Sequence, residues 1–167
     1  MRGKRAGYRN EGIDRILKRR KRKGMKKTGI INKKLCEQLA GLGHTDCFLV
    51  CDAGFPVPRD AICIDLAIRF GEPGLTDCVD AILSEVIVEE VAIAEESLEN
   101  NRILPDYVEK RFRNQRISTL PQKELAECGK NAKFIVRSGD VEPYSNILLT
   151  AASGVEKYRR GLVIEPD

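Results

Sequence analysis

Short apolar runs recur along the chain between residues 25 and 155, and polar segments rich in glycine and proline separate them. Continuous apolar runs of this length are typical of strands that are covered on both faces of a sheet. The pattern predicts six strands, at residues 47–51, 62–68, 86–88, 117–120, 134–137 and 147–150.

Between these runs, apolar residues recur at the spacing of a helix. The first predicted helix carries Leu35, Leu39 and Leu42, with Asn32 as its N-cap. Further helices are predicted at residues 76–83, from residue 89 with an apolar side of Val91, Ala94 and Leu98, from Pro105, and at residues 122–128, where Gly129 ends the helix. Strands that alternate with helices indicate an α/β fold with helices on both faces of the sheet.

The positive charge of the chain is concentrated in its first segment. Residues 1–24 hold 11 Lys and Arg against 2 acidic residues, whereas residues 25–167 hold 18 against 23. The basic run at 18–23 allows two interpretations. It is either an arm for nucleic acid or another anionic surface, or an upstream region translated from a misplaced start, with Met25 as the true first residue.

We favour the misplaced start, because Lys and Arg codons can consist entirely of purines and such a run resembles a ribosome-binding region. The expected organisation is a basic extension at 1–24, one domain at 25–155 and a C-terminal extension at 156–167. The basic extension has little apolar surface to bury and is expected to be disordered. No apolar run approaches the ~18 residues of a membrane span, so we expect no membrane partner. Because we favour the misplaced start over a nucleic-acid arm, we expect no nucleic acid as a partner either.

The six cysteines form no C-x-x-C pair, and most lie in or beside apolar runs, where a free thiol behaves as a small hydrophobic group. Reduced thiols of this kind are expected in a cytoplasmic protein. The domain has no glycine-rich phosphate loop and no H-E-x-x-H motif, and its single histidine argues against a histidine-rich metal site.

The remaining candidate chemistry is acid/base chemistry. His44 stands just before the predicted strand at 47–51 and Asp52 just after it, while Tyr144 and Asn146 lie in a turn-rich segment before the last strand. Histidine exchanges protons near neutral pH, and carboxylate and amide groups hydrogen-bond to polyhydroxylated ligands, so this set suits proton transfer on a sugar. In one extended chain His44 and Asp52 would lie roughly 26 Å apart. A capping role for His44 and a turn-forming role for Asp52 are the structural alternatives.

Seven sequence blocks follow one another from Met25 to Val155, among them G-H-T-D at 43–46, V-C-D-A-G-F-P-V-P at 50–58 and P-Y-S-N at 143–146. Together they resemble the D-ribose pyranase family, which is related to the L-fucose mutarotases. The resemblance implies a three-layer α/β/α single domain with a mixed, largely parallel sheet. It also implies a homodecamer of two pentameric rings, with sites between subunits.

The activity that the resemblance implies is an isomerase activity on D-ribose. Such an enzyme interconverts β-D-ribopyranose and β-D-ribofuranose by acid/base-assisted ring opening and closing, without a metal or cofactor. Two alternatives stay open: a mutarotase for another sugar, such as L-fucose, and a catalytically weak sugar-binding or regulatory relative.

The resemblance also assigns roles by position. It makes His44 the general acid, and the sugar-binding residues become Asp52, Gln122, Tyr144, Ser145 and Asn146. Gln122 departs from the family, whose members usually carry a second histidine at this place. Glutamine can hydrogen-bond a sugar hydroxyl but cannot carry a proton, so the expected consequence is retained binding with slower turnover.

Overall fold

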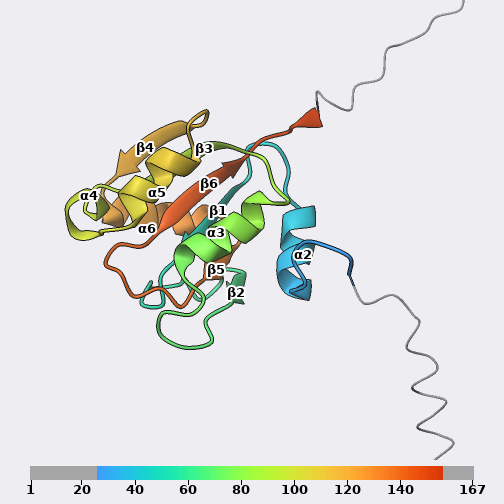
Figure 1. The fold of residues 1–167 in the computed structure, drawn as a ribbon, viewed down its shortest axis with the longest axis horizontal. Coiled ribbons are helices and arrows are strands. Elements are labelled where there is room, and N and C mark those ends of the chain that lie inside the picture. Colours follow the sequence, from blue (N-terminus) through green and yellow to red (C-terminus); the bar gives the residue numbers. More distant parts are fainter. Residues whose placement is uncertain (1–25, 156–167) are drawn as a thin grey trace, which may run out of the picture.

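The structure is a computed structural model that describes residues 26–155 (Figure 1). The expected extensions at 1–24 and 156–167 lie outside the described residues. The strands are β1 (Cys47–Cys51), β2 (Cys63–Asp65), β3 (Val88–Ala94), β4 (Arg116–Leu120), β5 (Ile135–Arg137) and β6 (Ile147–Ala151). The helices are α2 (Lys33–Ala40), α3 (Leu75–Leu83), α4 (Ser97–Asn100), α5 (Leu104–Arg111) and α6 (Gln122–Asn131).

The strands form one six-stranded sheet in the order β2-β5-β1-β6-β3-β4. β1, β2 and β5 run parallel to one another, as do β3 and β4, and β6 runs antiparallel to both of its neighbours, β1 and β3. The sheet is therefore mixed and largely parallel, as predicted. One edge of the sheet collects the carboxyl ends of five strands and the beginning of β6, and we call it the carboxyl edge; the opposite edge is the amino edge.

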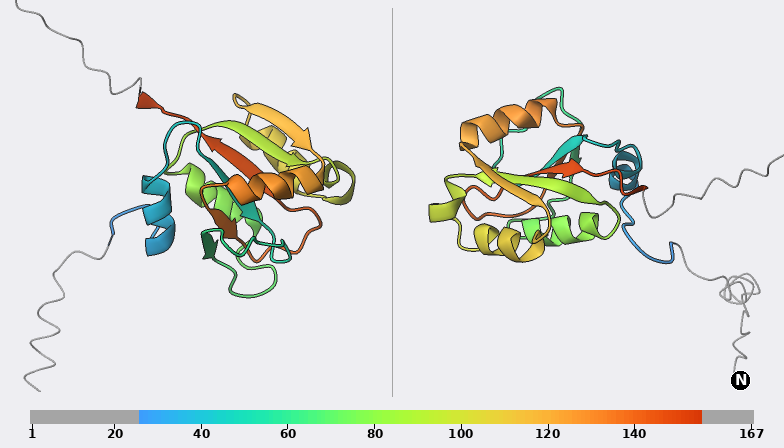
Figure 2. Two further views of the ribbon diagram at one scale, coloured as in Figure 1. Left: turned by 180° about the vertical axis from the view of Figure 1, so that it is seen from behind. Right: turned by 90° about the horizontal axis from the view of Figure 1, so that it is seen from above.

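Helices cover both faces of the sheet. Figure 2 shows α6 on one face and α3 and α5 on the other. The larger part of the core joins the sheet to α2, α3 and α5, and the stacked rings of Phe48 and Phe134, 5.1 Å apart, lie within it. The smaller part lies between the sheet and α6, around Leu49, Leu125 and Ile135. The three-layer α/β/α prediction is confirmed.

The helix predicted from residue 89 is wrong, because this segment is strand β3. Every residue from Val91 to Ala94 is buried, since β3 pairs on both sides, with β4 and β6, and the sheet is covered on both faces. A surface helix would bury only one stripe of residues. Leu98, assigned to the apolar side of that helix, is 54% exposed.

Two predicted boundaries also differ from the structure. Helix α6 continues past Gly129 to Asn131. Gly129 packs against the sheet, where an added β-carbon would lie 3.2 Å from Leu49 Cδ2. Glycine at this position favours close packing of α6 on the sheet and does not end the helix. Strand β2 is shorter than the predicted 62–68, and the chain leaves the sheet after Asp65 in a loop at residues 66–74.

Candidate active site

Asp52 and Asn146 meet at the carboxyl edge of the sheet. Asp52 follows β1, and the antiparallel direction of β6 brings the residue before it, Asn146, to the same edge. The Asn146 side-chain amide donates to Asp52 Oδ2 at 3.1 Å, and the Asp52 backbone N–H donates to Asn146 Oδ1 at 3.2 Å. Asn146 is almost fully buried, so this double hydrogen bond fixes the orientation of the carboxylate.

Burial raises the pKa of the Asp52 carboxyl above its usual range. Hydrogen bonds from the Gly54 N–H, at 2.8 Å, and from Asn146 favour the charged form and oppose the shift, while the nearby Asp140 adds to it. Loss of hydration therefore outweighs the donors. A ligand hydroxyl that donates to Asp52 would replace part of the lost hydration, which suits a sugar-binding carboxylate.

The segment before β6 has a fixed backbone. Tyr144 has a φ of 55°, in the left-handed region that few non-glycine residues occupy, and Ser145 is buried. The buried Asn101 holds the start of the segment, because its side-chain amide donates to the Pro143 carbonyl at 2.9 Å. Its oxygen accepts from the Leu104 N–H at the start of α5. Our sequence analysis missed Asn101, and only its position before the predicted helix at Pro105 offered a signal.

Gln122 lies at the same edge, at the start of α6. Its backbone N–H donates to Glu96 Oε2 at 2.8 Å, which links the helix to the end of β3. Its side-chain oxygen Oε1 is buried and has no hydrogen-bond partner within residues 26–155. A buried acceptor without a partner is costly, so Gln122 has an acceptor available for a hydroxyl donor.

His44 lies at the opposite, amino edge. Backbone hydrogen bonds of 2.9 Å from the Thr45 N–H to the Ala151 carbonyl and from the Ala151 N–H to the Asp46 carbonyl join its segment to the end of β6. His44 Nε2 lies 3.3 Å from Glu89 Oε2, and both side chains are exposed. Glu89 was missed from the sequence, where nothing links it to a histidine 45 positions away.

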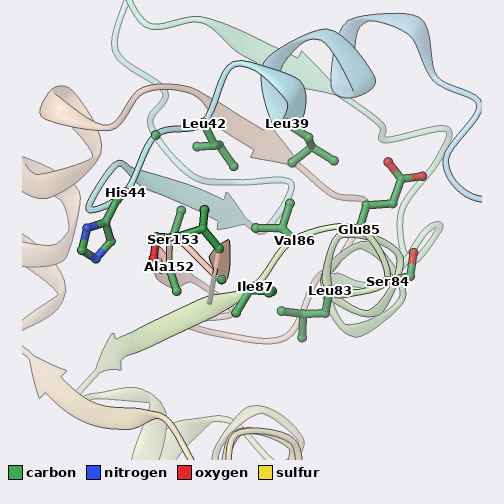
Figure 3. A pocket seen from close by; sticks show the side chains of 14 residues that line it. Leu39, Leu42, His44, Leu83, Ser84, Glu85, Val86, Ile87, Ala152 and Ser153 are labelled. Carbon is green, nitrogen blue, oxygen red and sulfur yellow. The ribbon is translucent and has the colours of Figure 1, made fainter. Parts of the chain in front are cut away.

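A pocket of about 630 Å³ with both polar and apolar walls opens beside His44, and we call it the His44 pocket (Figure 3). Leu39 and Leu42 line it from the end of α2, and Leu83 and Ile87 line it from the segment between α3 and β3. Within residues 26–155 no group of three side chains could ligate a metal ion.

Within one chain, five of the predicted site residues lie at the carboxyl edge of the sheet, and the sixth, His44, lies at the amino edge. The carboxyl edge holds Asp52, Gln122, Tyr144, Ser145 and Asn146. His44 lies at the other end of the β1–β6 pair, since the pairing puts Cys47 opposite Thr150 and Val50 opposite Ile147. This agrees with the separation expected for an extended strand, and a single chain cannot place His44 and Asp52 on the same small ligand.

A mixed sheet between two helical layers, with polar residues at its carboxyl edge, places the chain among α/β proteins that have a candidate ligand site at strand ends. The chain belongs to the RbsD / FucU transport protein family, which matches residues 25–155. The family resemblance expected from the seven sequence blocks is confirmed. No helix among residues 26–155 is long and apolar enough to cross a membrane.

Individual relatives agree with the family assignment. The chain is 42% identical over 146 residues to D-ribose pyranase 2 of Rubrobacter xylanophilus, covering 86% of this chain and 94% of that protein. It is 38% identical to Bacillus subtilis RbsD in its complex with D-ribose, with a TM-score of 0.74, covering 77% of this chain and 98% of the other. The fucose mutarotase of Streptococcus pneumoniae, in complex with L-fucose, is 22% identical with a TM-score of 0.61, covering 73% and 93% of the two chains, and shares the fold.

Proposed function

We propose that this protein is a D-ribose pyranase, an isomerase that interconverts β-D-ribopyranose and β-D-ribofuranose. The observation that carries the proposal is the hydrogen-bonded pair of the partly buried Asp52 and the buried Asn146 at the carboxyl edge, in a chain 38–42% identical to a ribose-bound RbsD and to a D-ribose pyranase. Neither a phosphate-binding loop nor a nucleophile motif competes with acid/base chemistry in the sequence.

The reaction needs proton transfers and no group transfer. His44 protonates the ring oxygen O5 while the anomeric hydroxyl loses its proton, which breaks the C1–O5 bond and gives the open-chain aldehyde. Attack of O4 on C1, with the proton movements reversed, closes the furanose ring, so the net proton count is unchanged. A positioned acid/base group accelerates such steps by ~10²–10⁴-fold.

The carboxyl-edge residues hold the sugar during these steps. The Asp52 carboxylate accepts from a hydroxyl in the orientation that Asn146 sets. The buried Gln122 Oε1 accepts from a second hydroxyl, and the half-buried Tyr144 borders the same segment. Gln122 binds without exchanging protons, so proton transfer falls to His44 and to solvent.

The complete site lies between two copies of the chain. His44 of one subunit faces the sugar held by Asp52 of the next, within a homodecamer of two pentameric rings. The opposite positions of His44 and Asp52 on the β1–β6 pair support this arrangement. We also place the enzyme in the cytoplasm, where the six free thiols of residues 26–155 would stay reduced.

NMR saturation transfer between the pyranose and furanose signals of D-ribose tests the activity directly. We expect faster exchange with the protein than without it. Sugar binding without faster exchange would contradict the proposal and favour a binding protein. L-fucose, measured in parallel, tests the choice of substrate.

Mixed subunits test whether the site is shared. His44→Ala and Asp52→Ala proteins should each be inactive, whereas rings refolded from an equal mixture should regain about a quarter of the sites, because each shared site needs one intact residue from each copy. No recovery in verified mixed rings would show that one chain supplies both residues.

A further inference from the structure

Residues 66–74, which we call the docking loop, present large apolar side chains to solvent. Ile68 is 83% exposed and Phe70 86% exposed, the two highest values among large apolar residues in the described part of the chain. Single exposed apolar residues are common, but two on one loop form a patch of the kind that marks contact surfaces.

The docking loop is held in place by hydrogen bonds to Gly139 and by hydrogen bonds within the loop. The Gly71 N–H donates to the Gly139 carbonyl at 2.6 Å, and the Gly139 N–H donates to the Pro73 carbonyl at 2.8 Å. Arg69 makes two hydrogen bonds to the Glu72 carboxylate, at 2.9 and 2.8 Å. A loop fixed in this way loses little conformational entropy when it binds, which favours a contact surface.

The docking loop lies beside the carboxyl-edge half of the site. Ile68 and Phe70 line a pocket of about 500 Å³ together with Ala53, the residue after Asp52. The Ala53 N–H donates to the Asp140 carbonyl at 2.9 Å, which fixes this junction. Whatever binds Ile68 and Phe70 is thereby brought close to Asp52.

The His44 pocket is the matching surface at the amino edge. Leu39, Leu42, Leu83, Val86 and Ile87 form its apolar walls, Ser84, Glu85 and Ser153 add polar groups, and Figure 3 shows these side chains around the opening next to His44. A projecting loop with exposed apolar side chains thus lies next to Asp52, and a recess that is apolar over part of its lining lies next to His44.

We propose that Ile68 and Phe70 of one subunit insert into the His44 pocket of the next, and that this contact delivers His44 to the sugar bound at Asp52. The inference rests on the proposed function, because it takes the two-chain site as given and adds the surface that builds it. The occupant is a second copy of this chain, since neither copy has a complete site alone. A contact between two different surfaces of identical copies is head-to-tail, and such contacts form a ring when the rotation between copies closes.

Photo-crosslinking tests the contact without reference to activity. The variant Phe70→p-benzoylphenylalanine, mixed with ¹⁵N-labelled protein, should form crosslinks between chains that map to Leu39, Leu42 or Ile87. The same probe at Ile117, 43% exposed on the far edge strand β4, should not reach these residues. Crosslinks from position 70 to any other surface, or a pocket filled by residues 156–167 of the same chain, would overturn the proposal.

Matched substitutions test whether the contact of Ile68 and Phe70 with the His44 pocket holds the subunits together. Phe70→Ser should weaken subunit association roughly 30-fold, the effect of losing an anchor residue at an interface, and Ile68→Thr should act in the same direction. Ile117→Thr makes the same chemical change at the control position and should leave assembly intact. Light scattering gives the assembly state, and circular dichroism verifies folding.

The two proposals fail in different ways. If wild-type protein does not accelerate ribose exchange but position 70 crosslinks into the His44 pocket, the proposed function is wrong and the contact stands. If wild-type protein is active and Phe70→Ser stays assembled with unchanged exchange, the contact is wrong and the function stands.

Discussion

Asn146 and Asp52 are joined by two hydrogen bonds although 94 positions separate them in the chain. One bond uses the Asp52 backbone and the other its carboxylate, so a single amide positions both the strand end and the functional group. Under the proposed function this relationship holds the Asp52 carboxylate ready for a sugar hydroxyl, so its disruption should affect both stability and binding.

Asn146→Ala should lower the free energy of unfolding by roughly 1–3 kcal/mol, because a buried N–H and a carboxylate oxygen lose their partner. Ribose binding should weaken as well, since Asp52 loses its orientation. Urea unfolding and ribose titration measure the two effects. Asn114→Ala, at an exposed position, should change stability by no more than about 0.5 kcal/mol; equal effects of the two variants would contradict the role of Asn146.

Stability should depend on the protonation of Asp52. Because burial raises the pKa of Asp52 in the folded protein, the folded state holds this proton more tightly than the unfolded state does. The resulting stabilisation is present below the unfolded pKa of about 3.9 and is lost as the pH rises through the higher folded pKa. As the pH rises through the folded pKa of Asp52, wild type should lose this stabilisation, whereas Asp52→Asn has no carboxyl to titrate. The free energy of unfolding of Asp52→Asn relative to wild type should therefore increase with pH, as measured by urea unfolding at stepped pH. A decrease would show that the pKa of Asp52 is lowered in the folded protein, not raised.

His44→Ala should separate activity from stability. Exchange between ribose forms should slow by ~10²–10⁴-fold, because the proton donor is lost. The free energy of unfolding should fall by less than about 1 kcal/mol, since the exposed pair with Glu89 contributes little. Ribose exchange by NMR and thermal unfolding provide the two readouts, and retained exchange would remove His44 from the mechanism.

Gln122→His should increase the exchange rate. It introduces a group that exchanges protons near neutral pH in place of an amide that cannot. Saturation transfer with D-ribose measures the rate, and a ribose titration shows whether binding is kept. A variant that folds and binds but has an unchanged rate would show that Gln122 does not limit turnover.

Gly139→Ala should destabilise the docking loop. A β-carbon at this position would lie 2.5 Å from the Arg69 carbonyl oxygen, a backbone atom that cannot move alone. We expect a loss of roughly 2–3 kcal/mol in the free energy of unfolding. Gly41→Ala, whose β-carbon would make ordinary contacts from 3.4 Å, is the matched control, and similar stability of the two variants would contradict the prediction.

Local signals in the sequence were sufficient for much of the fold. The N-cap at Asn32 was predicted from residue type and spacing, and its side chain accepts from the Leu35 N–H at 3.0 Å. The strands β1 and β6 were recognised from short, continuous apolar runs. In these segments propensity, pattern and burial point to the same element.

Strand β3 could not be recognised in the same way. Val91 and Ala94 are three positions apart, which fits a helix, and four glutamates stand next to the apolar residues. Only the neighbouring strands β4 and β6 make a strand the better solution, because they satisfy its backbone groups on both sides.

The positions of the candidate site residues along the chain could be predicted from the sequence, but their contacts in space could not. Asp52 and Asn146 were each expected beside an apolar strand, but their contact depends on β6 running antiparallel beside β1, and strand order is not encoded locally. Glu89 lies against a histidine 45 positions away, so no local pattern could reveal it. The position of Asn101 signals only its bonds to the start of α5, because its bond to the Pro143 carbonyl spans 42 positions.

The placement of His44 before β1 and Asp52 after it has a consequence for the number of complete sites in the proposed assembly. If the site is shared as we propose, each copy contributes His44 to a site with one neighbour and Asp52 to a site with another, because the two residues lie at opposite ends of the β1–β6 pair. An open row of copies would leave one unmatched half at each extremity. A closed ring has no terminal copies, so every His44 in it meets the Asp52 of a neighbour and no site is incomplete.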